Sequence, residues 1–276
     1  MIRILTLVEN QTGARKGLEA EHGLSFVVYA DGVRILFDCG AGRAAAKNCR
    51  LLNVAPASVD VTVLSHSHYD HAAGLPFLAE RGLRAETVIG EHFFEEKYGA
   101  GEGGTFAYLG CGFDEDSLGT WTPSVTVNGR TVRLTARCTA ETGFPRRFSW
   151  ETIPARFVKR TAQGLVPDDF ADEQCLVLEL KDGLALVAGC SHPGILNMVT
   201  EVGARYGRPV TAVIGGIHLK GSGEERIRNT VQELKAAGVR RMWCNHCSGA
   251  EAEKIMREDP EICCGHLGAG DCLFLE

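Results

Sequence analysis

Short apolar runs alternate with polar, glycine-containing turns along the first 95 residues, a pattern typical of an α/β protein. The expected strands cover residues 2–8, 24–29, 33–38 and 59–64, and the expected helices cover 44–52 and 72–78. Asp31-Gly32 lies between the second and third strands and predicts a hairpin turn. Antiparallel strands followed by a helix and a further strand predict a mixed sheet with helices packed outside it.

The same regularity returns after residue 172. The expected elements are strands at 173–180, 184–188, 210–214 and 240–244, and helices at 194–206 and 224–237. The first two of these strands flank the turn at 181–183 and predict a second hairpin. The whole chain, 1–276, is therefore expected to form one α/β domain.

The middle of the chain, residues 91–166, lacks this regular alternation and is a candidate inserted lobe within that domain. It contains the glycine-dense segment 99–104, which predicts a loop, and Asn128-Gly129, which predicts a hairpin over 124–134. Residues 130–160 hold eight Lys or Arg side chains against two Glu. This excess of positive charge favours a phosphorylated or carboxylated substrate, although a solvated basic face would have the same composition.

Composition narrows the classes of protein that need consideration. A formal net charge of −6 argues against broad nucleic-acid binding, and no run of about 18 apolar residues is present, so neither nucleic acid nor a membrane is an expected partner. Residues 1–8 have the pattern of a strand rather than of a secretory signal. The eleven cysteines are therefore expected to be reduced thiols in a cytoplasmic protein.

Three histidines and one aspartate follow the strand expected at 59–64, as His66, His68, Asp70 and His71. His66 and His68 are two residues apart and project to the same side of an extended backbone. Asp70 and His71 lie at the entrance of the next helix. Imidazole and carboxylate donors together suit zinc, iron or manganese, so this segment is predicted to bind metal.

Further histidines follow later strands. Cys190 and His192 end the strand at 184–188, and His246 follows the strand at 240–244, so these residues are candidate ligands of the same metal site. His218 follows the strand at 210–214 and is a candidate acid or substrate contact, or else a structural histidine. Cys190, if it is a ligand, favours thiolate-tolerant ions such as zinc or iron.

The order His-x-His-x-Asp-His after a strand resembles the hallmark of the metallo-β-lactamase superfamily. Four segments are similar to the branch related to dihydropterin-aminobenzene-phosphate synthase: residues 21–25, 64–75, 189–194, and 215–219 together with 245–249. The resemblance implies a four-layer αββα sandwich with an inserted segment, and metals at the strand ends between two sheets. It also shows two departures: Cys190 stands where hydrolases of the superfamily usually have a bridging aspartate, and no suitable histidine lies between 72 and 191. Either His192 takes the missing ligand's role or one metal site is weak.

The leading hypothesis is a metal-dependent hydrolase that acts on a small anionic, phosphorylated substrate through a metal-activated water. One or two divalent ions, zinc before iron or manganese, would be held by His66, His68, Asp70, His71, His192 and His246. Asp70 would also orient the water, and His218 and Arg146 would contact the substrate, with Arg147 and Lys159 as further candidates for its anion. The alternatives are a pterin-linked transferase, which would release diphosphate, and a non-catalytic metal-bound sensor.

Overall fold

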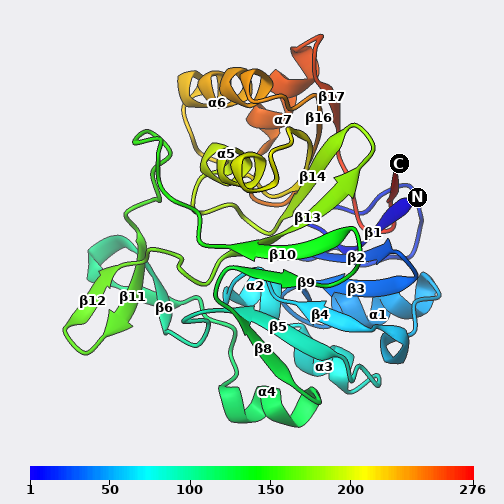
Figure 1. The fold of residues 1–276 in the computed structure, drawn as a ribbon. Coiled ribbons are helices and arrows are strands. Elements are labelled where there is room, and N and C mark those ends of the chain that lie inside the picture. The colour runs from blue at the N-terminus through cyan, green and yellow to red at the C-terminus, as the bar shows by residue number, and fades with distance from the viewer.

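The computed structural model describes residues 1–276 and places two seven-stranded sheets face to face (Figure 1). The first sheet has the order β18-β1-β2-β3-β4-β5-β8. Its strands are β1 (Ile2–Val8), β2 (Ser25–Ala30), β3 (Val33–Phe37), β4 (Val61–Val63), β5 (Glu86–Gly90), β8 (Val125–Asn128) and β18 (Cys272–Leu275). The strands from β3 to β8 run parallel, so β4 and β5 end at the same edge of the sheet.

The second sheet has the order β17-β16-β15-β14-β13-β10-β9. Its strands are β9 (Thr131–Arg133), β10 (Cys138–Thr142), β13 (Gln174–Leu180), β14 (Gly183–Ala188), β15 (Val210–Gly215), β16 (Arg241–Cys244) and β17 (Cys263–Gly265). Strands β14 to β17 are parallel. Both expected hairpins are confirmed, because β2 pairs with β3 and β13 pairs with β14 in antiparallel register.

Apolar side chains fill three interfaces and define four layers. Between the sheets, Phe26 and Phe37 of the first sheet meet Leu176 and Val187 of the second. One outer core packs the first sheet against α1 (Ala44–Leu51), α2 (Tyr69–Ala72), α3 (Leu75–Ala79) and α4 (Glu115–Trp121). The other packs the second sheet against α5 (Ile195–Tyr206), α6 (Glu224–Ala236) and α7 (Ala250–Glu258), at the top of Figure 1. The predicted αββα sandwich is confirmed.

A third, four-stranded antiparallel sheet projects beside the sandwich, at the left of Figure 1. Its order is β12-β11-β6-β7, formed by β6 (Lys97–Ala100), β7 (Phe106–Tyr108), β11 (Phe157–Thr161) and β12 (Gly164–Pro167). The strands of the candidate lobe at 91–166 are therefore shared among three sheets, since β8, β9 and β10 belong to the two large sheets. The boundary drawn at 91–166 stays a prediction, and only part of that range forms a separate layer.

The hairpin predicted around Asn128-Gly129 is wrong. β8 pairs with β5 in the first sheet, whereas β9 pairs with β10 in the second, so the turn carries the chain from one sheet to the other. The Asn128 amide explains the exchange, because it donates to Ala140 O at 3.1 Å and to Gln174 Oε1 at 2.9 Å across the sheets. An Asn-Gly turn signals a reversal of direction but not which strand receives the chain.

The helix expected at 72–78 is divided into α2 and α3. Gly74 lies between them with its N–H donating to Gly40 O at 2.9 Å, and a Cβ there would lie 1.9 Å from Cys39 O. Pro76 then occupies the first turn of α3, where its missing N–H costs nothing. The remaining helices are two single 3-10 turns, Pro56–Ser58 and Glu102–Gly104. None of the helices has the length and apolarity needed to cross a membrane.

Candidate metal centre

The candidate ligands converge because β4 of the first sheet and three parallel neighbours of the second sheet end at one edge of the sandwich. β4 delivers the 65–71 segment, β14 delivers Cys190 and His192, β15 delivers His218 and β16 delivers His246. His218 and His246 have positive φ angles of 48° and 52°, and Ser191 has one of 62°. Such backbone conformations are costly for non-glycine residues and persist only where the surroundings hold them, commonly at functional sites.

His66, His68 and His192 form the first group of donors. One ligand atom from each lies within 4.8 Å of the others, and all three side chains are buried. Their Nε2 atoms have no hydrogen-bond partner, an unusual state for buried polar atoms. Burial lowers the pKa of each imidazole well below its ordinary value, so the rings are neutral and can donate a lone pair. These residues fit a divalent metal ion.

Asp70 is the centre of a second group with His22 and His246. Asp70 Oδ2 lies 3.2 Å from His22 Nε2 and 3.1 Å from His246 Nε2. Burial alone would raise the pKa of this carboxyl group, but the nearby His71 and the bonds from His22 and His246 hold it well below its usual range. His22 carries no signal of its own in the sequence; it reaches Asp70 because the Leu24 N–H donates to Asp70 O at 3.1 Å and holds residues 21–24 against the 65–71 segment.

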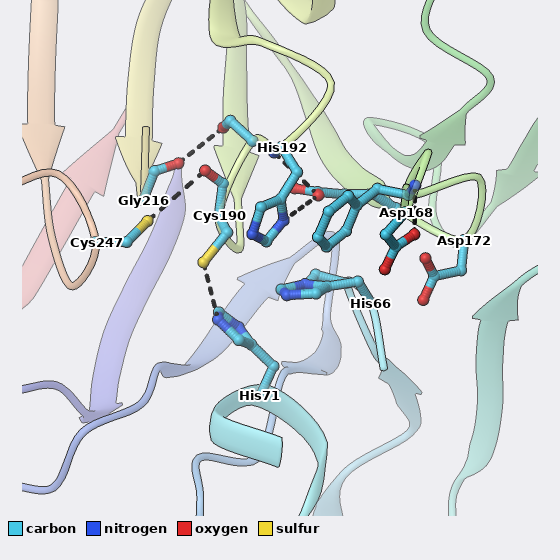
Figure 2. A network of polar contacts seen from close by, with 12 residues as sticks. His66, His71, Asp168, Asp172, Cys190, His192, Gly216 and Cys247 are labelled. Atoms are coloured by element: carbon cyan, nitrogen blue, oxygen red, sulfur yellow. Dashed lines mark hydrogen bonds and ion pairs between the residues drawn. The ribbon is translucent and has the colours of Figure 1, made fainter. Parts of the chain in front are cut away.

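His71 joins the site through Nε2, which lies 3.2 Å from Cys190 Sγ (Figure 2). Its Nδ1 faces the buried Asp38 Oδ2 at 2.7 Å. Burial alone would lower the pKa of His71, but Asp38 and Asp70 together raise it to about 9. An imidazole held at Nδ1 by a carboxylate presents Nε2 to a metal in a fixed direction.

Two further histidines, His192 and His246, are also held through their backbone N–H and Nδ1. The His192 backbone N–H donates to Glu173 Oε2 at 3.0 Å, and His192 Nδ1 lies 2.7 Å from the same oxygen. His246 donates its backbone N–H to Glu9 Oε1 at 2.7 Å, and its Nδ1 lies 3.1 Å from Asn10 Oδ1. These outer contacts are of the kind that supports metal ligands in proteins.

A cavity of about 430 Å³ opens over these residues. Its lining comprises His22, His68, Tyr69, Asp70, Leu109, Arg156, Phe157, Cys190, His192, His218, Lys220, Gly221, His246 and Cys247. His218 lies in the cavity wall, and its role as an acid or substrate contact stays a prediction. Arg156 and Lys220 bring positive charge to the wall, and neither takes part in an ion pair with a carboxylate group of the protein.

The basic residues singled out in the sequence are differently placed. Arg146 does not line the cavity; its guanidinium donates to His192 O at 3.5 Å and to Asp169 O at 2.9 Å. Arg147 pairs with Glu201, and Lys159 pairs with Glu95 and Asp169. A local excess of basic residues did not distinguish charges neutralised within the fold from those at the cavity, where Arg156 and Lys220 lie.

Comparison with known proteins agrees with this geometry. Residues 18–129 match the family model of the metallo-β-lactamase superfamily, whose members bind divalent metals. The chain is 33% identical over 273 residues to the 7,8-dihydropterin-6-methyl-4-(beta-D-ribofuranosyl)-aminobenzene-5'-phosphate synthase of Methanocaldococcus jannaschii, covering 94% of this chain and 91% of that one. It is 28% identical over 272 residues to a second protein of that organism, MJ0448, with coverage of 97% and 98%.

Among solved structures, the crystal structure of Tm1679, described as a metal-dependent hydrolase of the β-lactamase superfamily, is similar over 100% of this chain and 99% of that one. The TM-score is 0.87 and the sequence identity is 27%. The sandwich, the histidine motif at the end of β4 and the similarity over nearly the whole length lead to one assignment. The chain belongs to the metallo-β-lactamase superfamily.

Proposed function

We propose that the protein is a metal-dependent hydrolase of a small phosphorylated substrate. The observation that carries the proposal is the group of unpartnered Nε2 atoms of His66, His68 and His192, beside a cavity that also holds Arg156 and Lys220. Neutral imidazoles suit a divalent cation, and free cationic side chains suit a phosphate. The similarity to Tm1679, described as a metal-dependent hydrolase, supports the reaction class.

His66, His68 and His192 would hold one ion, and Asp70 and His246, grouped with His22, would hold a second; zinc is the leading candidate before iron or manganese. His71 belongs to an overlapping group with His66 and Cys190 and lies beside both ions. Such an ion supplies Lewis acidity and a bound water of lowered pKa. Asp70 is ionised and faces the cavity, so its carboxylate can accept a proton from an attacking water and orient it.

The rest of the cavity wall would bind and shield the substrate. Arg156 and Lys220 provide charge-assisted hydrogen bonds to phosphate oxygens. Tyr69, Leu109 and Phe157 supply apolar surface, which excludes bulk water and strengthens the electrostatic contacts inside the cavity. We also propose that the protein is cytoplasmic, a location supported by eleven free cysteines, eight of them buried.

A second candidate is favoured by the 33% identity to the Methanocaldococcus jannaschii synthase. In this reading the same site would join an activated pterin to an aminobenzene-ribosyl phosphate and release diphosphate. The two cationic side chains would then bind phosphate groups that do not react with water. The two functions share the cavity and differ in the product that leaves it.

Metal content and reaction products separate these functions. Elemental mass spectrometry of untagged protein purified without added metal should give one or two zinc, iron or manganese ions per chain. The protein would then be tested on a panel of phosphoesters in ¹⁸O-labelled water, and separately on a pterin diphosphate with aminobenzene-ribosyl phosphate. Label in the released phosphate supports the hydrolase, and diphosphate release without label supports the synthase.

The Asp70→Ala variant tests whether the protein is an enzyme at all. Either enzyme should lose most of its rate, whereas a metal-bound sensor would have no turnover to lose. His92→Asn is a matched control, because His92 lies outside the cavity and has a positive φ of 63° that Asn tolerates. Both enzymatic proposals would be overturned if the purified protein contained no metal and showed no turnover in any assay, with or without added metal.

A further inference from the structure

A sulfur-containing cluster of donors lies beside the histidines, formed by Cys190, His218 and Cys247. Their ligand atoms all lie within 4.8 Å of one another. Both cysteines are buried, and His218 Nδ1 is a buried atom without a hydrogen-bond partner. We propose that these three residues bind a soft divalent ion through two thiolates and one imidazole, as a site additional to the histidine and aspartate groups.

The dimensions of the cluster suit a tetrahedral ion. Zinc–sulfur bonds of about 2.3 Å and zinc–nitrogen bonds of about 2.0–2.1 Å put the donors of one ion roughly 3.5–3.8 Å apart. All three pairs of donors lie within 4.8 Å of one another, which is near this spacing. Cys190, His218 and Cys247 all line the cavity, which leaves a fourth position open to water or substrate.

The backbone around Cys247 is built to admit its sulfur. A Cβ on Gly216 would lie 2.2 Å from Gly189 O and 2.6 Å from Cys247 Sγ, so glycine is required where these loops meet. Gly216 is fixed on both sides, since its N–H donates to Gly189 O at 3.1 Å and its carbonyl accepts from Ser191 Oγ at 2.7 Å (Figure 2). The loops after β14 and β15 are thus held around the thiol.

The loops that carry His218 and Cys247 are also joined directly. The Lys220 N–H donates to Cys247 O at 3.1 Å, and the Ile217 N–H donates to Ser248 Oγ at 3.2 Å. The Cys247 thiol itself makes a weak contact with Cys190 O at 3.7 Å. The structure therefore fixes the backbone of the three donors relative to one another, and His218 Nδ1 has no hydrogen-bond partner that a metal ion would have to displace.

Cys190 connects this cluster to the histidine groups. Its sulfur lies 3.2 Å from His71 Nε2, on the side away from Cys247 in Figure 2. A Cys190 thiolate can therefore bridge an ion at His71 and an ion at His218 and Cys247. Two thiolates at one ion select zinc or iron over manganese, which prefers oxygen donors.

Cobalt substitution tests the proposal without a substrate. Metal-free protein would be titrated with Co²⁺ under reducing conditions, and thiolate-to-cobalt charge-transfer absorption would be recorded in the near ultraviolet. We expect this absorption in the unaltered protein, a loss of about half of it in Cys247→Ser, and its absence when Cys190→Ser is added. Cys244→Ser should match the unaltered protein, because Cys244 is buried outside the cavity against Met256 Sδ, 3.6 Å away.

Cys247→Asp separates loss of the sulfur from loss of folding, because it keeps an anionic metal donor but removes the sulfur. It should bind as much cobalt as the unaltered protein while losing about half of the charge-transfer absorption. No such absorption in the unaltered protein, or full absorption in both Cys247 variants, would overturn the site. The result is independent of the phosphoester assays, so a failure of the proposed function leaves this test readable.

Discussion

Lys97 and Asp172 form a fully buried ion pair, with Nζ 2.7 Å from Oδ1, where the four-stranded sheet meets the candidate metal centre. The other carboxylate oxygen of Asp172 accepts the backbone N–H of Ser67 at 2.9 Å, inside the histidine motif. Lys97 also lies 3.1 Å from Asp168 Oδ2. Figure 2 shows Asp168 and Asp172 beside His66. The pair therefore fastens β6 to the segment that carries the first ligands.

Replacing Lys97 should destabilise the protein strongly. Lys97→Met leaves Asp168 and Asp172 buried without their cation, and breaking such a pair costs about 3–5 kcal/mol. Urea unfolding followed by circular dichroism would measure the loss. Arg160→Met, which removes an exposed pair with Glu96 from the same sheet, should change the midpoint little. An equal loss of unfolding free energy in the two variants would show that the burial of the Lys97 pair does not increase its contribution to stability.

The sequence was sufficient for the main architecture and for the densest part of the site. Periodicity located the strands and helices of the sandwich, because half-buried and buried elements repeat apolar residues at a fixed interval. His66, His68, Asp70 and His71 could be identified because they are neighbours in the chain. The structure brings these four residues together with His192 and His246, which were expected there because each follows a strand, and their role as ligands stays a proposal.

What the sequence missed depends on contacts between distant segments. Lys97 and Asp172 are 75 positions apart, and nothing near Lys97 in the chain marks it as a buried cation. Likewise, Arg156 and Arg146 lie in one basic stretch, and only the packing of the loop decides which of them reaches the cavity. Cys247 lacked a signal because its sulfur lies against Gly216, in the loop after β15.

Asp38 should control metal affinity without touching the metal. Its carboxylate faces His71 Nδ1 at 2.7 Å and accepts the backbone N–H of Ser65 at 2.6 Å. Asp38→Asn is a clean test, because Asp38 has a φ of 61° that Asn also tolerates. We expect metal affinity to fall about 10–100-fold, measured by competition with a chelator. Asp182→Asn, at an exposed pair with Arg241, should leave the affinity unchanged; an equal affinity for Asp38→Asn would contradict the supporting role.

Metal removal should lower the stability of the fold. An ion that binds only the folded chain stabilises it by about 2.7 kcal/mol when free metal is at 100 times the dissociation constant. Dialysis against a chelator should therefore lower the melting temperature, and zinc should restore it. His68→Ala removes one buried donor and should weaken that response, whereas His92→Asn should keep it. An identical response in both variants would place the stabilising ion elsewhere.

Arg156 and Lys220 should determine affinity for phosphate rather than for metal. Each is a cation in the cavity wall without a carboxylate partner, so a bound phosphate gives it a charge-assisted hydrogen bond. Such bonds contribute about 1.5–3 kcal/mol, so we expect Arg156→Ala or Lys220→Ala to weaken binding of a phosphorylated substrate roughly 10–150-fold. Metal content should not change, since neither side chain belongs to a donor group.

The matched control is Arg147→Ala, whose guanidinium already pairs with Glu201 at 2.7 Å and does not line the cavity. Inorganic phosphate serves as a probe before a substrate is known, with binding measured by calorimetry on the metal-loaded protein. Because attraction between charges is screened by salt, the difference between the cavity variants and the unaltered protein should shrink as ionic strength rises. Phosphate binding that is equally weakened by Arg147→Ala would assign the effect to overall charge, and the cavity cations would then have no specific role.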